Sequence, residues 1–146
     1  MEIDTELAKQ IIIDHYESPI TKVKKFKNSN YIKGHNDSPS CIDNIDSYVL
    51  IKNNRIKDVK FSGIGCAICT SSTDLLALEI IGKSLTTAKK IINNYLNMIY
   101  EKKVDINLLG KLIIYKNVSK QANRIKCAVT GIQAIQKAIN KYEKKQ

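Results

Sequence analysis

The chain has 146 residues, of which 43% are hydrophobic, and it carries 24 Lys and Arg against 14 Asp and Glu. This length and composition predict one domain over residues 1–146 with a core of its own. No stretch approaches the ~20 apolar residues of a membrane span, and the acidic first residues do not resemble a secretory leader. We therefore expect a cytoplasmic protein with no membrane partner.

The net charge of +10 raises the question of nucleic acid binding. The basic residues are almost all lysine, with arginine only at Arg55 and Arg124, and the chain has no tryptophan. No tight cluster of basic and aromatic residues of the kind that stacks on bases is present in the sequence. The charge therefore favours a solvated, lysine-rich surface and disfavours nucleic acid as a partner.

The first forty residues contain one clear element. Apolar residues at helical spacing predict a helix over 3–16, which Pro19 would end. The lysine- and asparagine-rich stretch 22–33 is typical of a loop or a short edge strand. Residues 34–40 have the composition of a turn, with glycine, asparagine, aspartate, serine and proline.

The middle of the chain favours a hairpin that leads into a tight turn. Runs rich in β-forming residues at 45–52 and 56–61 are separated by Asn53 and Asn54, which predicts two antiparallel strands. The second strand leads directly into the turn Gly63-Ile64-Gly65-Cys66.

Helical periodicity dominates the remainder. Residues 67–81 and 84–99 predict two helices, the first ended by a glycine and the second capped by a serine or threonine hydroxyl. Residues 102–122 predict a mostly irregular or short-helical insertion. The last helix is expected from about Cys127 to Glu143.

The cysteines suggest a shared site. Four cysteines without a signal peptide indicate a reducing compartment, where metal-binding or catalytic roles outrank disulfides. Cys41 follows a turn, whereas Cys66 and Cys127 are predicted at helix starts, where unpaired N–H groups favour a thiolate. Ordinary core cysteines would have no reason to lie at three separate junctions between elements. These three cysteines are therefore expected to share a site. Cys69 lies one helical turn further on and is best explained as a small buried hydrophobe.

Several chemistries are compatible with this set. A Cys-x-x-Cys at a helix start resembles a redox motif only weakly, and a zinc ribbon would need a second such pair. Three separated thiolates with an oxygen or nitrogen donor suit tetrahedral zinc or an iron–sulfur cluster. Asp43 lies two residues after Cys41, so on extended chain both side chains would point the same way. Asp43 is therefore either the fourth ligand or a solvated turn residue.

Four segments resemble motifs of the NifU/IscU/SufU family. Ile13–Pro19 resembles its His-Tyr-x-x-Pro segment, and Ser38–Asp43 resembles Asn-Pro-x-Cys-Gly-Asp. Phe61–Cys69 resembles Phe-x-Gly-x-Gly-Cys-x-Ile-Ser, and Arg124–Ala128 resembles Arg-x-Lys-Cys-Ala. Their order and spacing agree over nearly the whole chain.

Within the family, the resemblance is to the SufU branch. Lys126 stands where IscU scaffolds carry a histidine, and the IscU motif Leu-Pro-Pro-Val-Lys is absent. Residues 102–123 correspond to an insertion typical of SufU proteins. The resemblance implies an α+β fold of the SufE/IscU type, a three-stranded antiparallel sheet with helices on one face. The third strand would lie in the 22–33 region.

The resemblance also implies a function in iron–sulfur cluster assembly. A SufU-type protein is a zinc-dependent sulfur relay that accepts persulfide sulfur from a cysteine desulfurase. It passes the sulfur to a downstream scaffold or to apoproteins. The alternative is a scaffold, and then not an enzyme, on which a [2Fe–2S] cluster assembles on the same cysteines.

Carried over to this chain, the family's metal ligands correspond to Cys41, Asp43, Cys66 and Cys127. Cys127 would accept the sulfur, and Arg124 and Lys126 would lie close to it, where their charges favour a thiolate. Because Cys127 is expected to open the last helix beside a loop, it is the ligand best placed to leave the metal.

Two departures from the family pattern concern the site. Ile42 replaces the family glycine between Cys41 and Asp43. Cys69 replaces a serine or a similar small residue, and it would share a helix face with Cys66. Cys69 could serve as an alternative ligand or as a resolving thiol, but we favour a place in the core.

Overall fold

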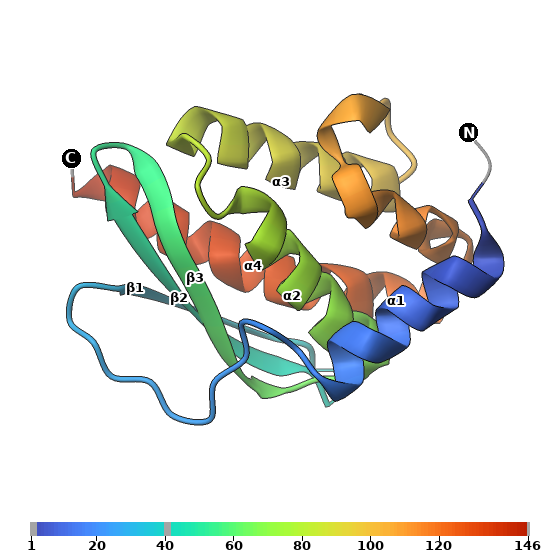
Figure 1. The fold of residues 1–146 in the computed structure, drawn as a ribbon, viewed down its shortest axis with the longest axis horizontal. Helices are drawn as coiled ribbons and strands as arrows, with labels where there is room; N and C mark the ends of the chain where they lie inside the picture. Colours follow the sequence, from blue (N-terminus) through green and yellow to red (C-terminus); the bar gives the residue numbers. More distant parts are fainter. Residues whose placement is uncertain (1–2, 40–41, 146) are drawn as a thin grey trace.

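The computed structural model describes residues 3–39 and 42–145 (Figure 1). Three strands form one antiparallel sheet in the order β1-β2-β3, with β1 at Ile32–Asp37, β2 at Asn44–Lys52 and β3 at Arg55–Ile64. The helices are α1 (Thr5–Glu17), α2 (Ala67–Ile80), α3 (Leu85–Ile99) and α4 (Ala122–Lys144), with 3₁₀ segments η1 (Ile106–Leu108) and η2 (Gly110–Lys120) before α4. The predicted fold class is confirmed.

The β2–β3 hairpin follows its sequence pattern. Asn53 and Asn54 both have positive φ, 53° and 57°, the left-handed conformation that a tight two-residue hairpin turn requires. Val49 pairs with Val59 across the two strands. Along β2, alternate side chains are buried against the helices, namely those of Ile45, Ser47, Val49 and Ile51.

Strand β1 is the main departure from the predicted elements. The prediction of a turn at 34–40, with the third strand in 22–33, is wrong because the strand runs over Ile32–Asp37. The residues Gly34 to Asp37 have low strand propensity, but contacts with α4 outweigh it. Asn36 Nδ2 donates to Thr130 O at 3.1 Å, and Lys141 Nζ donates to Lys33 O at 2.7 Å.

The segment between α1 and β1 covers the opposite side of the sheet. Lys22 forms an isolated parallel bridge with Phe61 on the outer edge of β3. Phe26 packs against Tyr31 and Tyr48, with ring centroids 4.7 and 5.1 Å apart. This segment pairs with the free edge of β3 at Phe61, and Ser84 pairs with the same strand at Arg55.

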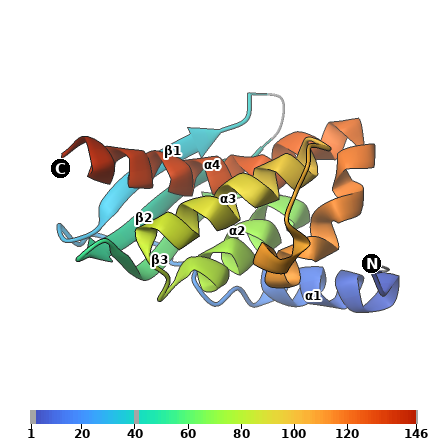
Figure 2. The same ribbon diagram turned by 90° about the horizontal axis from the view of Figure 1, so that it is seen from above.

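The helices form two layers over the other face. Helix α4 lies across β1 and β2, and α2 lies beside it and contacts β3, while α1 packs on α2 (Figures 1 and 2). Helix α3 and η2 pack on the outside of this layer. The 3₁₀ segments agree with the short-helical insertion expected at 102–122, and they bury Leu109, Leu112, Tyr115 and Val118.

Helix α4 begins earlier than predicted. It starts at Ala122, not near Cys127, because residues 122–126 include no helix breaker and the chain turns into the helix at Gln121. The Arg124 N–H already donates to Gln121 O at 2.8 Å. Cys127 therefore lies in the second turn of α4 and not at its start.

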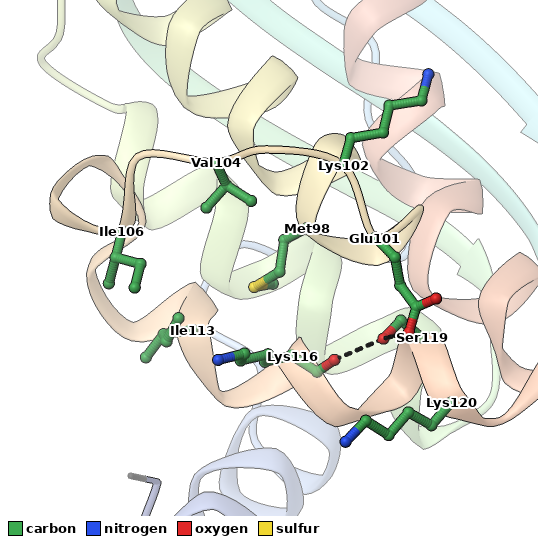
Figure 3. A pocket seen from close by; sticks show the side chains of 9 residues that line it. All are labelled: Met98, Glu101, Lys102, Val104, Ile106, Ile113, Lys116, Ser119 and Lys120. Atoms are coloured by element: carbon green, nitrogen blue, oxygen red, sulfur yellow. Dashed lines mark hydrogen bonds between the residues drawn. The ribbon is translucent and has the colours of Figure 1, made fainter. Parts of the chain in front are cut away.

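A pocket of about 310 Å³ lies between the end of α3 and the segment that follows it (Figure 3). Its lining combines apolar and charged side chains, among them Met98, Val104, Ile113, Glu101, Lys116 and Lys120. None of the predicted site residues that the structure describes lines this pocket. Within the described residues, no helix combines the length and the apolar character that crossing a bilayer requires.

Candidate metal and sulfur-transfer site

Asp43 supplies the first donor of the candidate site. It directly precedes β2, and its side chain is almost fully buried, with 1% of the residue exposed. Asp43 Oδ1 accepts a hydrogen bond from the Cys66 N–H at 2.9 Å, and Oδ2 lies 4.0 Å from Cys66 Sγ. The alternative of a solvated turn residue is therefore wrong.

Cys66 supplies the second donor and caps α2. Its Sγ accepts from the Cys69 N–H at 3.5 Å, so the sulfur lies among the free N–H groups at the helix start. The turn before it depends on Gly63, which has φ +119°. A Cβ at Gly63 would overlap the carbonyl oxygen of Asn44, so only glycine allows β3 to pass this close to β2.

Cys127 approaches from α4 and completes the described cluster. Donor atoms of Asp43, Cys66 and Cys127 all lie within 4.8 Å of one another. The three residues come from three different elements, the start of β2, the start of α2 and the second turn of α4. Cys41, the fourth predicted ligand, lies outside the described residues.

The electrostatics of the cluster favour a protonated Cys127 when no cation is bound. Burial raises the pKa of the Cys127 thiol, and its neighbours Cys66 and Asp43 raise it further. This is the opposite direction to the one expected from Arg124 and Lys126. Burial and the neighbouring Cys66 and Asp43 account for the raised pKa, whereas Arg124 and Lys126 have exposed side chains.

The donor set suits a soft divalent cation. Ligand bonds of ~2.3 Å to sulfur and ~2.0 Å to oxygen place the ligand atoms of a tetrahedral zinc site ~3.5–3.8 Å apart. The donor atoms here are within 4.8 Å, so small side-chain rotations would bring them to those distances. Two thiols and a carboxylate therefore fit zinc.

Cys69 does not belong to this cluster. It is fully buried and packs with Ile45, Phe61 and Ala134 in a small apolar group. Burial raises the pKa of its thiol, which keeps the sulfur protonated. The environment is that of a core residue.

The two cations predicted near Cys127 both lie on the exposed surface of α4. Arg124, one turn before Cys127, lines a groove of about 430 Å³ between α1, α2, η2 and α4. Lys126 directly precedes Cys127 in the sequence, and its carbonyl oxygen accepts from Thr130 Oγ1 at 2.7 Å. Neither side chain is among the donors of the cluster.

The family follows from the sequence comparison. Residues 7–146 match the family described as the NifU-like N-terminal domain. The chain belongs to this family. The resemblance stated from the motifs is thereby confirmed, and the match includes all three described donors.

Relatives of the NifU-like chain include proteins of both functional kinds. The zinc-dependent sulfurtransferase SufU of Bacillus subtilis (strain 168) is 32% identical over 142 residues, which is 97% of this chain and 94% of that protein. The iron–sulfur cluster assembly scaffold protein IscU of Streptococcus pyogenes serotype M1 is 29% identical over 106 residues, 72% of this chain and 67% of that protein. The crystal structure of an iron–sulfur cluster assembly scaffold protein for the SUF system (SufU) from Fervidobacterium islandicum AW-1 superposes with a TM-score of 0.80 at 31% identity, covering 89% of this chain and 94% of that one.

A buried polar network on α2 was not anticipated from the sequence. Asp74 is fully buried and hydrogen-bonds His15, Ile20 and Thr21. The only sequence signal is a run of small polar residues ending in a carboxylate within a helix that is otherwise apolar.

Proposed function

We propose that this NifU-like protein is a zinc-dependent sulfur relay of iron–sulfur cluster assembly. It would accept persulfide sulfur from a cysteine desulfurase and pass it to a downstream scaffold or to apoproteins. The observation that carries the proposal is the convergence of Asp43, Cys66 and Cys127, with donor atoms within 4.8 Å, in a chain similar to SufU. Cys41 is proposed as the fourth ligand on the strength of the motif that it shares with Asp43.

Each described donor has a separate part in this function. When bound, zinc supplies a positive charge that holds its sulfur ligands as thiolates and lowers their nucleophilicity. Asp43 is anchored by the Cys66 N–H, so it would remain in place when another donor leaves. Cys127 can leave the cluster by a change of side-chain rotamer, without unwinding α4.

The proposed transfer step is thiol–disulfide exchange. The Cys127 thiolate attacks the outer sulfur of the donor persulfide, so a new S–S bond forms at Cys127 and the S–S bond of the donor breaks. The donor cysteine leaves as a thiolate and takes a proton from solvent. The outer sulfur keeps its oxidation state, so the step needs no external oxidant or reductant.

The surface beside the site supports a protein as the sulfur donor. Ile42 and Ile64, next to Asp43 and near Cys66 in the chain, are 69% and 65% exposed. Large apolar side chains exposed beside a reactive thiol are typical of a contact with another macromolecule. The net charge of +10 would favour an acidic partner surface.

Comparison of Cys127→Ala with Cys69→Ala tests the proposal. Both substitutions remove one thiol from the same region, but only Cys127 lies in the cluster. We expect Cys127→Ala to abolish stimulation of a cognate desulfurase and to prevent persulfide formation, measured as a 32-Da increase by mass spectrometry. Cys69→Ala should retain both. If Cys127→Ala still stimulates the desulfurase, Cys127 is not the residue that accepts the sulfur.

The scaffold function is the second candidate, because the chain is also similar to IscU of S. pyogenes. Lys126 and the insertion at 102–123 favour the relay, since they follow the SufU pattern. Metal analysis of protein purified without chelators separates the two functions. Stoichiometric zinc supports the relay, whereas a stable coloured cluster that replaces zinc after anaerobic addition of iron and sulfide would favour the scaffold.

A further inference from the structure

A buried carboxylate on α2 holds the N-terminal segment against the helix. Asp74 Oδ1 accepts from both the N–H and the Oγ1 of Thr21, each at 2.7 Å. Its Oδ2 accepts from the Ile20 N–H at 3.1 Å and lies 2.6 Å from His15 Nδ1. A carboxylate can only accept, so the facing nitrogen of His15 carries the proton. All four donors come from residues more than fifty positions earlier in the chain.

Thr21 also holds the strand on the other side of the Cys66 turn. The Phe61 N–H donates to Thr21 O at 3.1 Å, and the Val23 N–H donates back to Phe61 O at 2.7 Å. Thr21 is therefore bonded through its carbonyl to β3 and through its N–H and hydroxyl to Asp74 on α2. Phe61 lies five residues before Cys66, and Asp74 lies eight residues after it.

These bonds join the two elements that place the site, β3 and α2. Asp43 is tied to β3 through the pairing of β2, in which Ile45 lies opposite Gly63. Cys66 is instead the cap of α2, so its position depends on how α2 leaves the turn. Only Gly65 and Cys66 lie between the end of β3 and the start of α2, and the glycine allows this short connection a wide range of backbone angles. The distance between Asp43 and Cys66 consequently depends on what joins β3 to α2.

We propose that Thr21, Asp74 and His15 form a positioning clamp for the Asp43–Cys66–Cys127 cluster, a role that rests on the proposed metal site. A buried carboxylate is a costly way to hold two helices together compared with apolar packing. It supplies directional bonds instead, to four donors at fixed positions. The clamp residues do not touch the donor atoms, and they act by holding Cys66 at the right distance from Asp43.

Thr21→Val tests the clamp with a minimal change, because it removes only the hydroxyl and preserves the shape and the strand propensity of the side chain. Thr21→Ser is the conservative control, since it restores the donor to Asp74. Tyr115→Phe is the matched structural control. It removes the buried 2.6 Å hydrogen bond from Tyr115 to Ser71, which lies on the same helix but joins α2 to η2.

Zinc affinity by chelator competition and the visible spectrum of the cobalt-substituted protein are the first measurements. We expect Thr21→Val to weaken zinc binding about tenfold, as the loss of a group that orients a metal ligand does, and to change the cobalt bands. Thr21→Ser should restore both. Tyr115→Phe should change zinc affinity by less than about twofold, even if it lowers stability as much as Thr21→Val. Wild-type affinity and spectrum in Thr21→Val would overturn the clamp.

Exchange of the Cys66 amide hydrogen, measured by NMR on the metal-free protein, gives a readout that does not depend on zinc. This amide donates to Asp43, so loss of the clamp should raise its exchange rate about tenfold in Thr21→Val and not in Tyr115→Phe. If the wild-type protein binds no zinc, the proposed metal site fails while this measurement still decides the clamp. Equal exchange in wild type and Thr21→Val would overturn it.

Discussion

The two faces of the sheet are covered in different ways, one by helices and the other by a loop. On the helix face, α4 comes so close to β1 that a Cβ at Gly34 would overlap the Ala134 carbonyl oxygen. On the opposite face, the covering is a loop whose Phe26 ring meets Tyr31 edge-on and Tyr48 at a tilt. On the first face the backbones of α4 and β1 are in close contact. On the second, loop side chains cover the sheet, and the loop backbone bonds the edge of β3 at Phe61.

This difference explains where the site lies. Asp43, Cys66 and Cys127 stand at the end of the sheet where β2, α2 and α4 converge on the helix face. Close backbone packing of α4 on the sheet leaves Cys127 little room to move relative to Asp43, with no need for a bound ion. The opposite face can tolerate change because loop side chains can rearrange.

Gly34→Ala should produce the largest effect, because both atoms that the new Cβ meets most closely belong to the backbone of α4. We expect the free energy of unfolding to fall by about 2–4 kcal/mol in urea denaturation. Zinc affinity should fall as well, since α4 carries Cys127. His35→Ala, one position along the same strand and exposed, should change stability by less than about 0.5 kcal/mol. An equal loss of stability in Gly34→Ala and His35→Ala would mean that the two faces of the sheet are packed alike.

Asp43→Ala should have the next largest effect. We expect zinc affinity to fall about ten- to hundredfold and stability to fall by about 1–2 kcal/mol, because the Cys66 N–H loses its acceptor. Asp46→Ala is the control from the same strand, since Asp46 is paired with His35 away from the site. Chelator competition measures both variants. Unchanged zinc affinity in Asp43→Ala would mean that Cys69 or solvent takes its position.

Cys69→Ser should have a smaller effect, limited to stability. The new hydroxyl would lie among Ile45, Phe61 and Ala134, which lowers the free energy of unfolding by about 1 kcal/mol. The zinc content should stay the same, as measured by elemental analysis. Loss of bound zinc in this variant would contradict the core environment of Cys69 and would make it a ligand.

Tyr31→Phe should have the smallest effect, and only at high pH. The hydrogen bond to Asp58 raises the pKa of Tyr31 to about 12, with burial and the Asp58 charge adding to it. The folded state therefore keeps this proton while the unfolded state loses it near pH ~10. The contribution of protonated Tyr31 to the free energy of unfolding is therefore complete below pH ~10 and is lost as the pH rises towards 12.

Denaturation between pH 8 and 12, together with ultraviolet titration of tyrosine, measures this contribution. Tyr31→Phe should flatten the decline in stability above pH ~10 and remove the tyrosine that titrates near pH 12. An unchanged decline would mean that the Asp58 contact does not hold the loop on the sheet.

Local sequence patterns were sufficient to predict an element where they agreed with the tertiary fold. Asn53 and Asn54 predicted the hairpin turn, and the apolar stripe from Leu85 to Ile99 predicted α3. Strand β1 was misplaced because the residues Gly34 to Asp37 carry turn chemistry, and only pairing with β2 and contact with α4 make them a strand. The start of α4 was misplaced because its first turn has no capping side chain to mark it.

The sequence by itself determined the family, the donor types and the three described residues proposed to hold zinc, because motif spacing records which side chains accompany one another along the chain. Tertiary structure alone decided that Asp43 is buried against the Cys66 N–H, that Cys127 lies inside a helix, and that Asp74 joins α1 to α2. These features depend on contacts between residues 23 to 59 positions apart, or on how far a helix extends. Local propensity carries no information about contacts between residues so far apart in the chain, because the packing of the elements sets these contacts.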